Sequence, residues 1–196
     1  FRNDYEVNSY PIFQDSNGIL WIVTEIGLGS YEPLYDDFIF FKNDSYMKNS
    51  LSSNNVRSIY EDSHHNLWIG TQNGLNLFNK KTQSFTSYFY SQKIQSNVNG
   101  IAEGYAPEGH SSNKLWITTE SNGLYYFDIN AKQFYEFNIH THQPTINTNN
   151  CIAKSKDNIL WIGTQNGLNK LDIKPKLFQT IRNEAEDIPS NYNNTT

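Results

Sequence analysis

Apolar residues recur along the chain in short clusters, and the most distinctive cluster appears twice in identical form. The ten residues 67–76, LWIGTQNGLN, are repeated letter for letter at 160–169. Shorter versions, LWIVT and LWITT, stand at 20–24 and 115–119. Self-similarity at a period of this length is the signature of repeat architectures, so it bears on every other feature. The pattern predicts four copies of one structural unit.

Several kinds of residue keep a common register through these copies. Successive tryptophans are 47, 48 and 45 residues apart. A Gly-Leu pair follows each tryptophan, and a phenylalanine stands ten residues beyond each of those leucines. The residues that define the register are Trp21, Trp68, Trp116 and Trp161 with Gly27, Gly74, Gly123 and Gly167. We expect structural roles for all eight, with the tryptophans packing between units.

Each unit is patterned as four short β-strands. In the second unit, strands are predicted at 56–61, 67–71, 75–78 and 85–89. Asn73-Gly74 between the second and third is among the strongest hairpin signals, because both residues accept a positive φ. No unit shows helical spacing. Four antiparallel strands in each unit of about 45 residues are typical of a β-propeller blade, so we predict an all-β fold of propeller blades.

The register also indicates how the chain is divided. Blades are predicted at approximately 8–49, 54–94, 97–143 and 148–183, with 184–196 leading into a further blade. We therefore interpret the chain as part of a larger propeller. Four blades could instead close as a small ring, or stay an open arc whose exposed apolar face would favour association. We expect a homo-oligomer, or completion by the remaining blades of a parent protein.

Composition excludes several classes of partner. The formal net charge is −5 and the sequence pI is about 5.5, so no basic surface is available for nucleic acid. Aromatic residues make up 15% of the chain, which favours strands. No apolar run approaches the ~18 residues that cross a bilayer, so we expect no membrane contact in this segment. The single Cys151 falls in a first strand, where we expect it to be buried.

Candidate chemistry is sparse. The five histidines are scattered and lack the further ligands that a zinc site needs, so we predict no metal. Phosphate-binding glycine loops are absent, and no cofactor is predicted. No pair of carboxylates belongs to a recognisable glycosidase motif, and no catalytic residue is assigned.

Ligand binding is the better hypothesis, because a propeller gathers its first strands around a central channel. Two residues before the first-strand isoleucine of each blade stand Tyr10, Arg57, Asn99 and Asn150. Such side chains hydrogen-bond hydroxyl groups; the alternative interpretation is that they are solvated channel residues or turn caps. The third unit carries an insertion that contains Tyr105, Glu108 and His110. Insertions on a rigid scaffold often carry specificity, so these are further candidates beside the alternative of a tolerated surface loop.

The units resemble the two-component regulator propeller repeat. The second unit carries the residues of that motif at Val56, Ile59, Asp62, Asn66, Leu67, Trp68, Ile69, Gly70, Thr71, Gly74 and Leu75. The other copies depart from it: Ser155 replaces the aspartate in the fourth, and Val23 and Thr118 replace the glycine after Trp-Ile in the first and third.

The resemblance implies a role for a parent protein. Such repeats form the periplasmic sensor of hybrid two-component systems, in which two seven-bladed propellers precede an immunoglobulin-like domain, a membrane span, a histidine kinase and a receiver with a DNA-binding region. The typical signals are oligosaccharides. The implied function is thus a periplasmic, non-enzymatic sensor segment with an oligosaccharide ligand. Two alternatives stay open: a glycan-active propeller enzyme, lyase or sialidase-like, and a ligand-free scaffold that mediates dimerisation.

Overall fold

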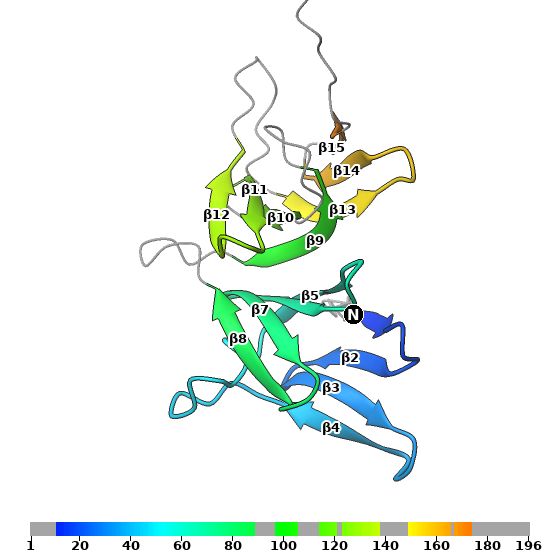
Figure 1. Cartoon of the computed structure of the whole chain (residues 1–196), viewed down its shortest axis with the longest axis vertical. Helices are drawn as coiled ribbons and strands as arrows, with labels where there is room; N and C mark the ends of the chain where they lie inside the picture. The colour runs from blue at the N-terminus through cyan, green and yellow to red at the C-terminus, as the bar shows by residue number, and fades with distance from the viewer. Residues whose placement is uncertain are drawn as a thin grey trace, which may run out of the picture.

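The computed structural model describes residues 11–88, 97–105, 114–120, 123–137, 149–165 and 167–173. Within these ranges the chain forms four antiparallel sheets and no helix (Figure 1). The first sheet contains β1 (Ile12–Gln14), β2 (Leu20–Thr24), β3 (Gly27–Glu32) and β4 (Asp37–Phe41). The second contains β5 (Val56–Glu61), β6 (Leu67–Thr71), β7 (Gly74–Asn79) and β8 (Ser84–Tyr88). The third contains β9 (Val98–Gly104), β10 (Lys114–Thr119), β11 (Leu124–Asp128) and β12 (Gln133–Glu136). The fourth contains β13 (Asn149–Lys154), β14 (Ile159–Thr164) and β15 (Gly167–Asp172).

The predicted fold class is confirmed, because each sheet is a meander in which consecutive strands pair. In the second blade, β5 and β6 have the predicted bounds, and β7 extends the predicted strand by one residue at each end. The predicted blade boundaries are not tested by the strand bounds and remain a prediction. The last strand of the fourth unit, predicted around Phe178, lies outside the described residues.

The sheets fan out from their first strands. β5 contacts β9, and β9 contacts β13, whereas β4, β8 and β12 lie at the outer edges of their sheets (Figure 1). This is the radial arrangement of propeller blades, with the first strand of each blade nearest the axis. The first strands are therefore the elements that bring residues of different blades together.

The four register glycines share one backbone conformation. Gly27, Gly74, Gly123 and Gly167 have φ angles of 129°, 105°, 86° and 124°. These values lie where a side chain clashes with its own backbone, so glycine is favoured. The hairpin between the second and third strands of each blade explains why the Gly-Leu pair recurs.

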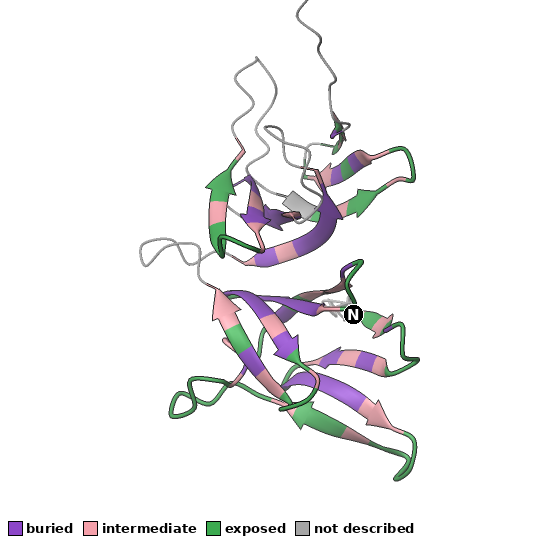
Figure 2. Cartoon of the chain, viewed as in Figure 1, coloured by how far each residue is buried: buried purple, intermediate pink, exposed green. Residues whose placement is uncertain are grey.

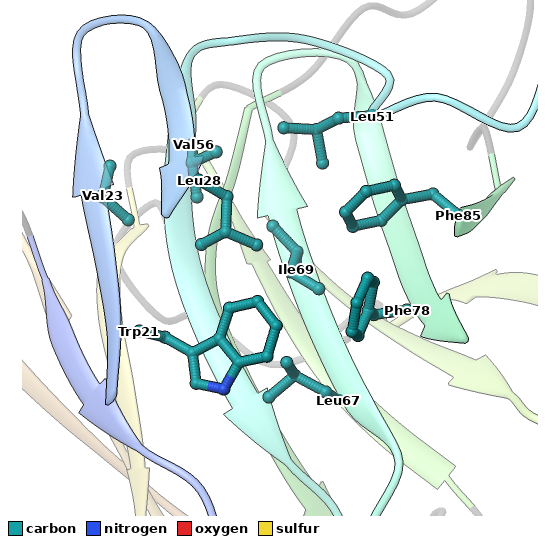
Figure 3. Packing of buried hydrophobic residues seen from close by; sticks show 9 residues of the cluster. All are labelled: Trp21, Val23, Leu28, Leu51, Val56, Leu67, Ile69, Phe78 and Phe85. Carbon is teal, nitrogen blue, oxygen red and sulfur yellow. The ribbon is translucent and has the colours of Figure 1, made fainter. Parts of the chain in front are cut away.

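Tryptophan packs between adjacent blades. Trp21 of β2 is 2% exposed and packs against Leu67 and Ile69, which flank the next tryptophan on β6 (Figure 3). The same arrangement recurs in two further clusters. Trp68 joins Leu115 and Ile117 of the third blade, and Trp116 joins Leu160 and Ile162 of the fourth. Each core thus joins the tryptophan face of one blade to the leucine–isoleucine face of the next.

The fourth tryptophan lies in a different environment. Trp161 is 37% exposed although its ten-residue segment is identical to that of Trp68. The strands of the fourth blade carry exposed and intermediate residues (Figure 2). Cys151, on the same face of the fourth blade, is exposed too, so the expectation that it is buried is wrong. The physical reason is that no following blade covers this face in the described residues. Position in a blade therefore does not by itself decide burial.

Candidate binding site on the first strands

Three of the predicted ligand-binding residues lie at β-bulges. Val56 pairs with Thr71 and Ser58 with Gly70, which leaves Arg57 as the extra residue of β5. The pairings of β9 and β13 shift in the same way, and there the extra residues are Asn99 and Asn150. A bulge leaves one residue unpaired and re-aims its side chain. The sequence position two residues before the first-strand isoleucine is therefore a repeated structural feature.

The bulges lie where neighbouring first strands approach each other. The Ser58 hydroxyl donates to the Val98 carbonyl oxygen at 3.0 Å, which joins β5 to β9 one residue from each bulge. A Cβ added to Gly100 would lie 3.0 Å from the backbone nitrogen of Ile152 on β13. These contacts place the three bulges in a row across three blades. Arg57 is exposed and Asn99 is half-buried, while the side chain of Asn150 lies outside the described residues.

Further polar groups flank this row on the same side of the blades. Before β5, the Asn55 carbonyl accepts from the backbone N–H of Gln72 at 2.9 Å, and the Asn55 side-chain amide donates to Gln72 at 3.4 Å. Before β9, the Asn97 amide donates to the Glu120 carboxylate. Both pairs tie the segment that enters a first strand to the turn after the second strand. The row of bulges is therefore bordered by amide and carboxylate groups.

The second group of predicted residues lies elsewhere. Tyr105 follows the last residue of β9, so the length of that strand separates it from Asn99. Tyr105 is half-buried, and its carbonyl oxygen accepts from the Trp116 indole N–H at 3.0 Å. Tyr10, Glu108 and His110 lie outside the described residues. The structure thus brings together Arg57 and Asn99 but not Tyr105.

At the opposite ends of the first strands, two aspartates organise the turns. Asp62 accepts from the backbone N–H groups of His64 and Asn66 and, at 2.8 Å, from the Trp68 indole. In the first blade, Asp15 likewise accepts from the backbone N–H of Ile19 and, at 3.3 Å, from the Trp21 indole N–H. Both carboxylates are buried, and their hydrogen bonds compensate the burial. The aspartate of the motif therefore fixes the turn and the tryptophan together.

A charged cluster, here called the seam cluster, joins the first two blades beside Asp15. Lys80 Nζ lies 3.0 Å from Glu61 Oε1 and 3.3 Å from Asp15 Oδ2. The Glu61 carboxylate also accepts from the backbone N–H of Ser16 at 2.7 Å and from its hydroxyl at 3.0 Å. The Ser16 hydroxyl lies 2.9 Å from His65 Nδ1. Residues from both blades therefore share one hydrogen-bonded network.

The sequence pattern did not single out this cluster, because Ser16 and Glu61 are 45 residues apart. A signal was nevertheless present. Asp-Ser occurs at 15–16 and at 62–63, and Ser63 donates to the Glu103 carboxylate of the third blade at 2.8 and 2.7 Å. Glu61 and Glu103 occupy the same place at the end of a first strand. The repeated serine and glutamate therefore form a repeated contact between blades.

The seam cluster shifts the ionisation of its members. Burial alone would raise the pKa of Asp15, but hydrogen bonds from Ile19, Trp21 and Lys80 hold it below its ordinary value. Burial alone would also raise the pKa of Glu61, and the donors Ser16 and Lys80 lower it. Burial opposes the charged form of Lys80, yet the two carboxylates raise its pKa. All three groups are therefore charged at neutral pH.

Replacing Lys80 with methionine is expected to lower the free energy of unfolding by about 1–2 kcal/mol at pH 7, because the buried Asp15 loses its cation. The carboxyl pKa values are depressed in the folded chain. The ordinary pKa values are 4.5 for Glu61 and 3.8 for Asp15, and above them the seam cluster contributes its full stabilisation. This stabilisation is lost as the pH falls through the lower pKa values that the two carboxyls have in the folded chain. Urea unfolding at pH 7 and pH 3 should show the difference between wild type and variant shrinking at pH 3. Lys81→Met, at an exposed neighbour on the same turn, is the control and should leave the free energy of unfolding unchanged at both pH values.

Other kinds of site find no support in the described part of the chain. No three His, Cys, Asp or Glu side chains there lie close enough to hold a metal ion. Nor does any helix in those ranges have the length and apolar character to cross a membrane. The arrangement best suited to a ligand is the row of bulges.

Comparison with known families matches the second blade to a known repeat. Residues 50–73 match the family model described as two component regulator propeller. The chain carries a two-component regulator propeller repeat. The match covers β5, the turn held by Asp62 and β6, which are the parts of the second blade that contain the bulge and the buried tryptophan.

Two of the similar solved structures are extracellular domains of bacterial one- or two-component systems. One is the extracellular domain of a protein of B. thetaiotaomicron described as a hybrid two-component system, with 29% sequence identity and a TM-score of 0.66, covering 83% of this chain and 23% of that one. Another, from the same organism, is described as the extracellular domain of a one-component system, with 25% identity and a TM-score of 0.65, covering 82% of this chain and 23% of the other. Streptogramin B lyase is similar in fold, with 18% identity and a TM-score of 0.56 over 85% of this chain and 55% of its own.

The chain thus spans about a quarter of the length of the extracellular domains that it matches. No curated protein matches its sequence. The two neighbours described above with 29% and 25% identity are extracellular domains of one- or two-component systems, whereas the similarity to the lyase, at 18% identity, extends to the fold alone.

Proposed function

We propose that this chain is an extracytoplasmic, ligand-binding segment of a hybrid two-component system, and that it responds to oligosaccharides. The signalling role is supported by the regulator-propeller match and by the similarity to extracellular domains of such systems. In this proposal the segment is not an enzyme and lies in the periplasm, as the outer part of a sensor histidine kinase anchored in the inner membrane.

The observation that carries the binding role is the row of bulges. Arg57, Asn99 and Asn150 are the extra residues of three neighbouring first strands. An amide side chain both donates and accepts, and a guanidinium donates through up to five N–H groups. Hydroxyl groups of a sugar both donate and accept, so a row of amide and guanidinium groups matches an oligosaccharide chain. The amides of Asn55 and Asn97 lie beside the same row and extend this chemistry.

The test is a thermal-shift screen of the purified chain against neutral and acidic oligosaccharides from partially hydrolysed polysaccharides. A ligand that binds only the folded chain stabilises it by about 2.7 kcal/mol at 100 times its dissociation constant, so the melting temperature should rise. Arg57→Ala should abolish most of that rise, because Arg57 is an exposed bulge residue and carries the cation of the row. Lys42→Ala, which removes an exposed cation away from the bulges, should leave the rise unchanged.

Two results would contradict the proposal. New reducing ends in the incubated oligosaccharides would indicate a glycan-active enzyme. A melting temperature that no oligosaccharide changes would indicate a scaffold without this ligand.

A further inference from the structure

A second polar position recurs in every blade, directly after the second strand. The residues there are Glu25 after β2, Gln72 after β6, Glu120 after β10 and Gln165 after β14. All four are exposed, including the two that belong to the second and third blades, which have a blade on either side. Exposure at this position is therefore a property of the blade and does not depend on which blades precede or follow it. These four residues are called the rim row below.

The rim row lies beside the row of bulges. The backbone N–H of Gln72 donates to the Asn55 carbonyl oxygen at 2.9 Å, and the backbone N–H of Glu120 donates to the Asn97 carbonyl oxygen at 3.2 Å. Asn55 and Asn97 each stand two residues before the bulge residue of their strand. Two residues of extended chain span about 7 Å. In two neighbouring blades a ligand on the bulges would therefore reach the rim row as well.

The rim residues offer hydrogen bonds of opposite kinds. The Asn97 amide donates to Oε2 of Glu120, and among the described residues no donor pairs with Oε1, which can accept from a ligand. The Asn55 amide donates to Oε1 of Gln72 at 3.4 Å, so the N–H groups of the Gln72 amide can donate to a ligand. A hydroxyl group both donates and accepts, whereas an ionised carboxyl group only accepts. Hydroxyl groups are therefore the partners that suit both rim residues.

The charges of the two rows oppose an acidic ligand. Arg57 is the cation of the bulge row, whereas the rim row carries the carboxylates of Glu25 and Glu120. The cation belongs to the second blade, and the carboxylates belong to the first and third, so a carboxylate lies in the blade on either side of it. A ligand with a negative group on each sugar would meet repulsion from both neighbours of Arg57. The formal net charge of −5 for the whole chain acts in the same direction.

We propose that the two rows bind a neutral oligosaccharide through its hydroxyl groups and discriminate against acidic oligosaccharides, and that Glu120 is a binding residue which accepts from a ligand hydroxyl. The inference rests on the proposed function, because it names the class of ligand for the same site. Both rows run from blade to blade, so successive sugar units of one chain meet successive blades. Arg57 then acts as a donor to neutral oxygen atoms and not as the partner of an anion.

Thermal-shift measurements and calorimetric titration of the whole chain test the class of ligand. The neutral probes are oligosaccharide mixtures from partial hydrolysis of cellulose, xylan and starch, and the acidic probes are mixtures from polygalacturonate and alginate. The melting temperature should rise with at least one neutral mixture and with no acidic mixture, because only a bound ligand stabilises the folded chain. A rise with an acidic mixture would overturn the inference and leave the proposed function intact. No rise with any mixture would contradict both.

Variants of Glu120 test its role with a neutral oligosaccharide that binds. Glu120→Ala should raise the dissociation constant about tenfold, because a hydrogen bond to a charged group is lost. Glu120→Gln keeps an accepting oxygen atom and should raise it by only about threefold or less. Glu136→Ala is the matched control, because Glu136 is an exposed carboxylate of the same blade on the outer strand β12. It should leave the dissociation constant unchanged.

Circular dichroism and the melting temperature without ligand check that each variant folds, which the exposed position of Glu120 favours. A neutral oligosaccharide that binds wild type and Glu120→Ala equally well would overturn the role of the rim row. If Arg57→Ala still weakened that binding, the proposed function would stand without the rim row.

Discussion

Replacing Trp68 with alanine is expected to lower the free energy of unfolding by about 3–5 kcal/mol. Trp68 is 1% exposed, and its ring lies 5.8 Å from that of Phe127 in the next blade and 6.1 Å from that of Tyr88 in its own. Its indole N–H also donates to the buried Asp62. The substitution therefore opens a cavity between two blades and removes a hydrogen bond from a buried carboxylate. Urea unfolding followed by circular dichroism measures the loss.

Trp161→Ala is the matched control, since the surrounding ten residues are the same. Trp161 is 37% exposed and has Lys170 Nζ 5.7 Å from its ring centroid rather than a covering blade. The loss of stability on this substitution should amount to about 1 kcal/mol or less. Equal losses at the two positions would show that the local segment, and not the neighbouring blade, stabilises the tryptophan.

Gly70→Val should destabilise the chain by about 3 kcal/mol, at the upper end of the cost of overpacking. A Cβ at Gly70 would lie 2.5 Å from the carbonyl oxygen of Val98 on the next blade and would also overlap the Ser58 hydroxyl. The obstacle includes backbone, so it cannot rotate away. In urea unfolding, the midpoint concentration should fall, while the slope of the unfolding free energy against urea concentration stays unchanged.

Gly163→Val at the same place in the fourth blade should cost about 1 kcal/mol, because overpacking against one side chain is the milder case. There a Cβ would meet only the Cys151 sulfur, at 2.7 Å. A similar loss of stability for Gly70→Val and Gly163→Val would contradict the view that Gly70 makes room for the first strand of the next blade.

The third blade shows why the motif glycine alone is an incomplete guide. Thr118 replaces it, and its strand partner is Gly100, where a Cβ would come within 3.0 Å of the Ile152 backbone. In the second blade the glycine is Gly70 and its partner is Ser58. The close approach between blades requires one small residue in the pair, on either strand. The departure of the third copy from the motif is thus compensated inside its own blade.

Local structure was predictable because it depends on short-range rules. The bounds of β5 and β6 follow from short apolar clusters that end at turn residues, and Gly74 marks the hairpin by its positive φ. Within the candidate site, the spacing to the first-strand isoleucine selected Arg57 and Asn99. It did not reveal that they are bulge residues, because a bulge is defined by the pairing of two strands.

Contacts between blades were not predictable from local pattern. Ser16 and Glu61 meet across the first seam, and Lys80 bridges Glu61 to Asp15 only because the two blades are adjacent. Tyr105 was grouped with the ligand-binding candidates by its insertion, yet the direction of β9 places it at the other end of the strand from Asn99.

The two identical ten-residue segments separate what each level determines. By itself the sequence determined, in both copies, a strand, a hairpin with a left-handed glycine and a second strand, because sterics and local hydrogen bonding act within a few residues. Only the tertiary structure decided that Trp68 is buried and Trp161 is half-exposed. The hydrophobic effect acts on surface removed from water, and that surface depends on whether another blade lies against it.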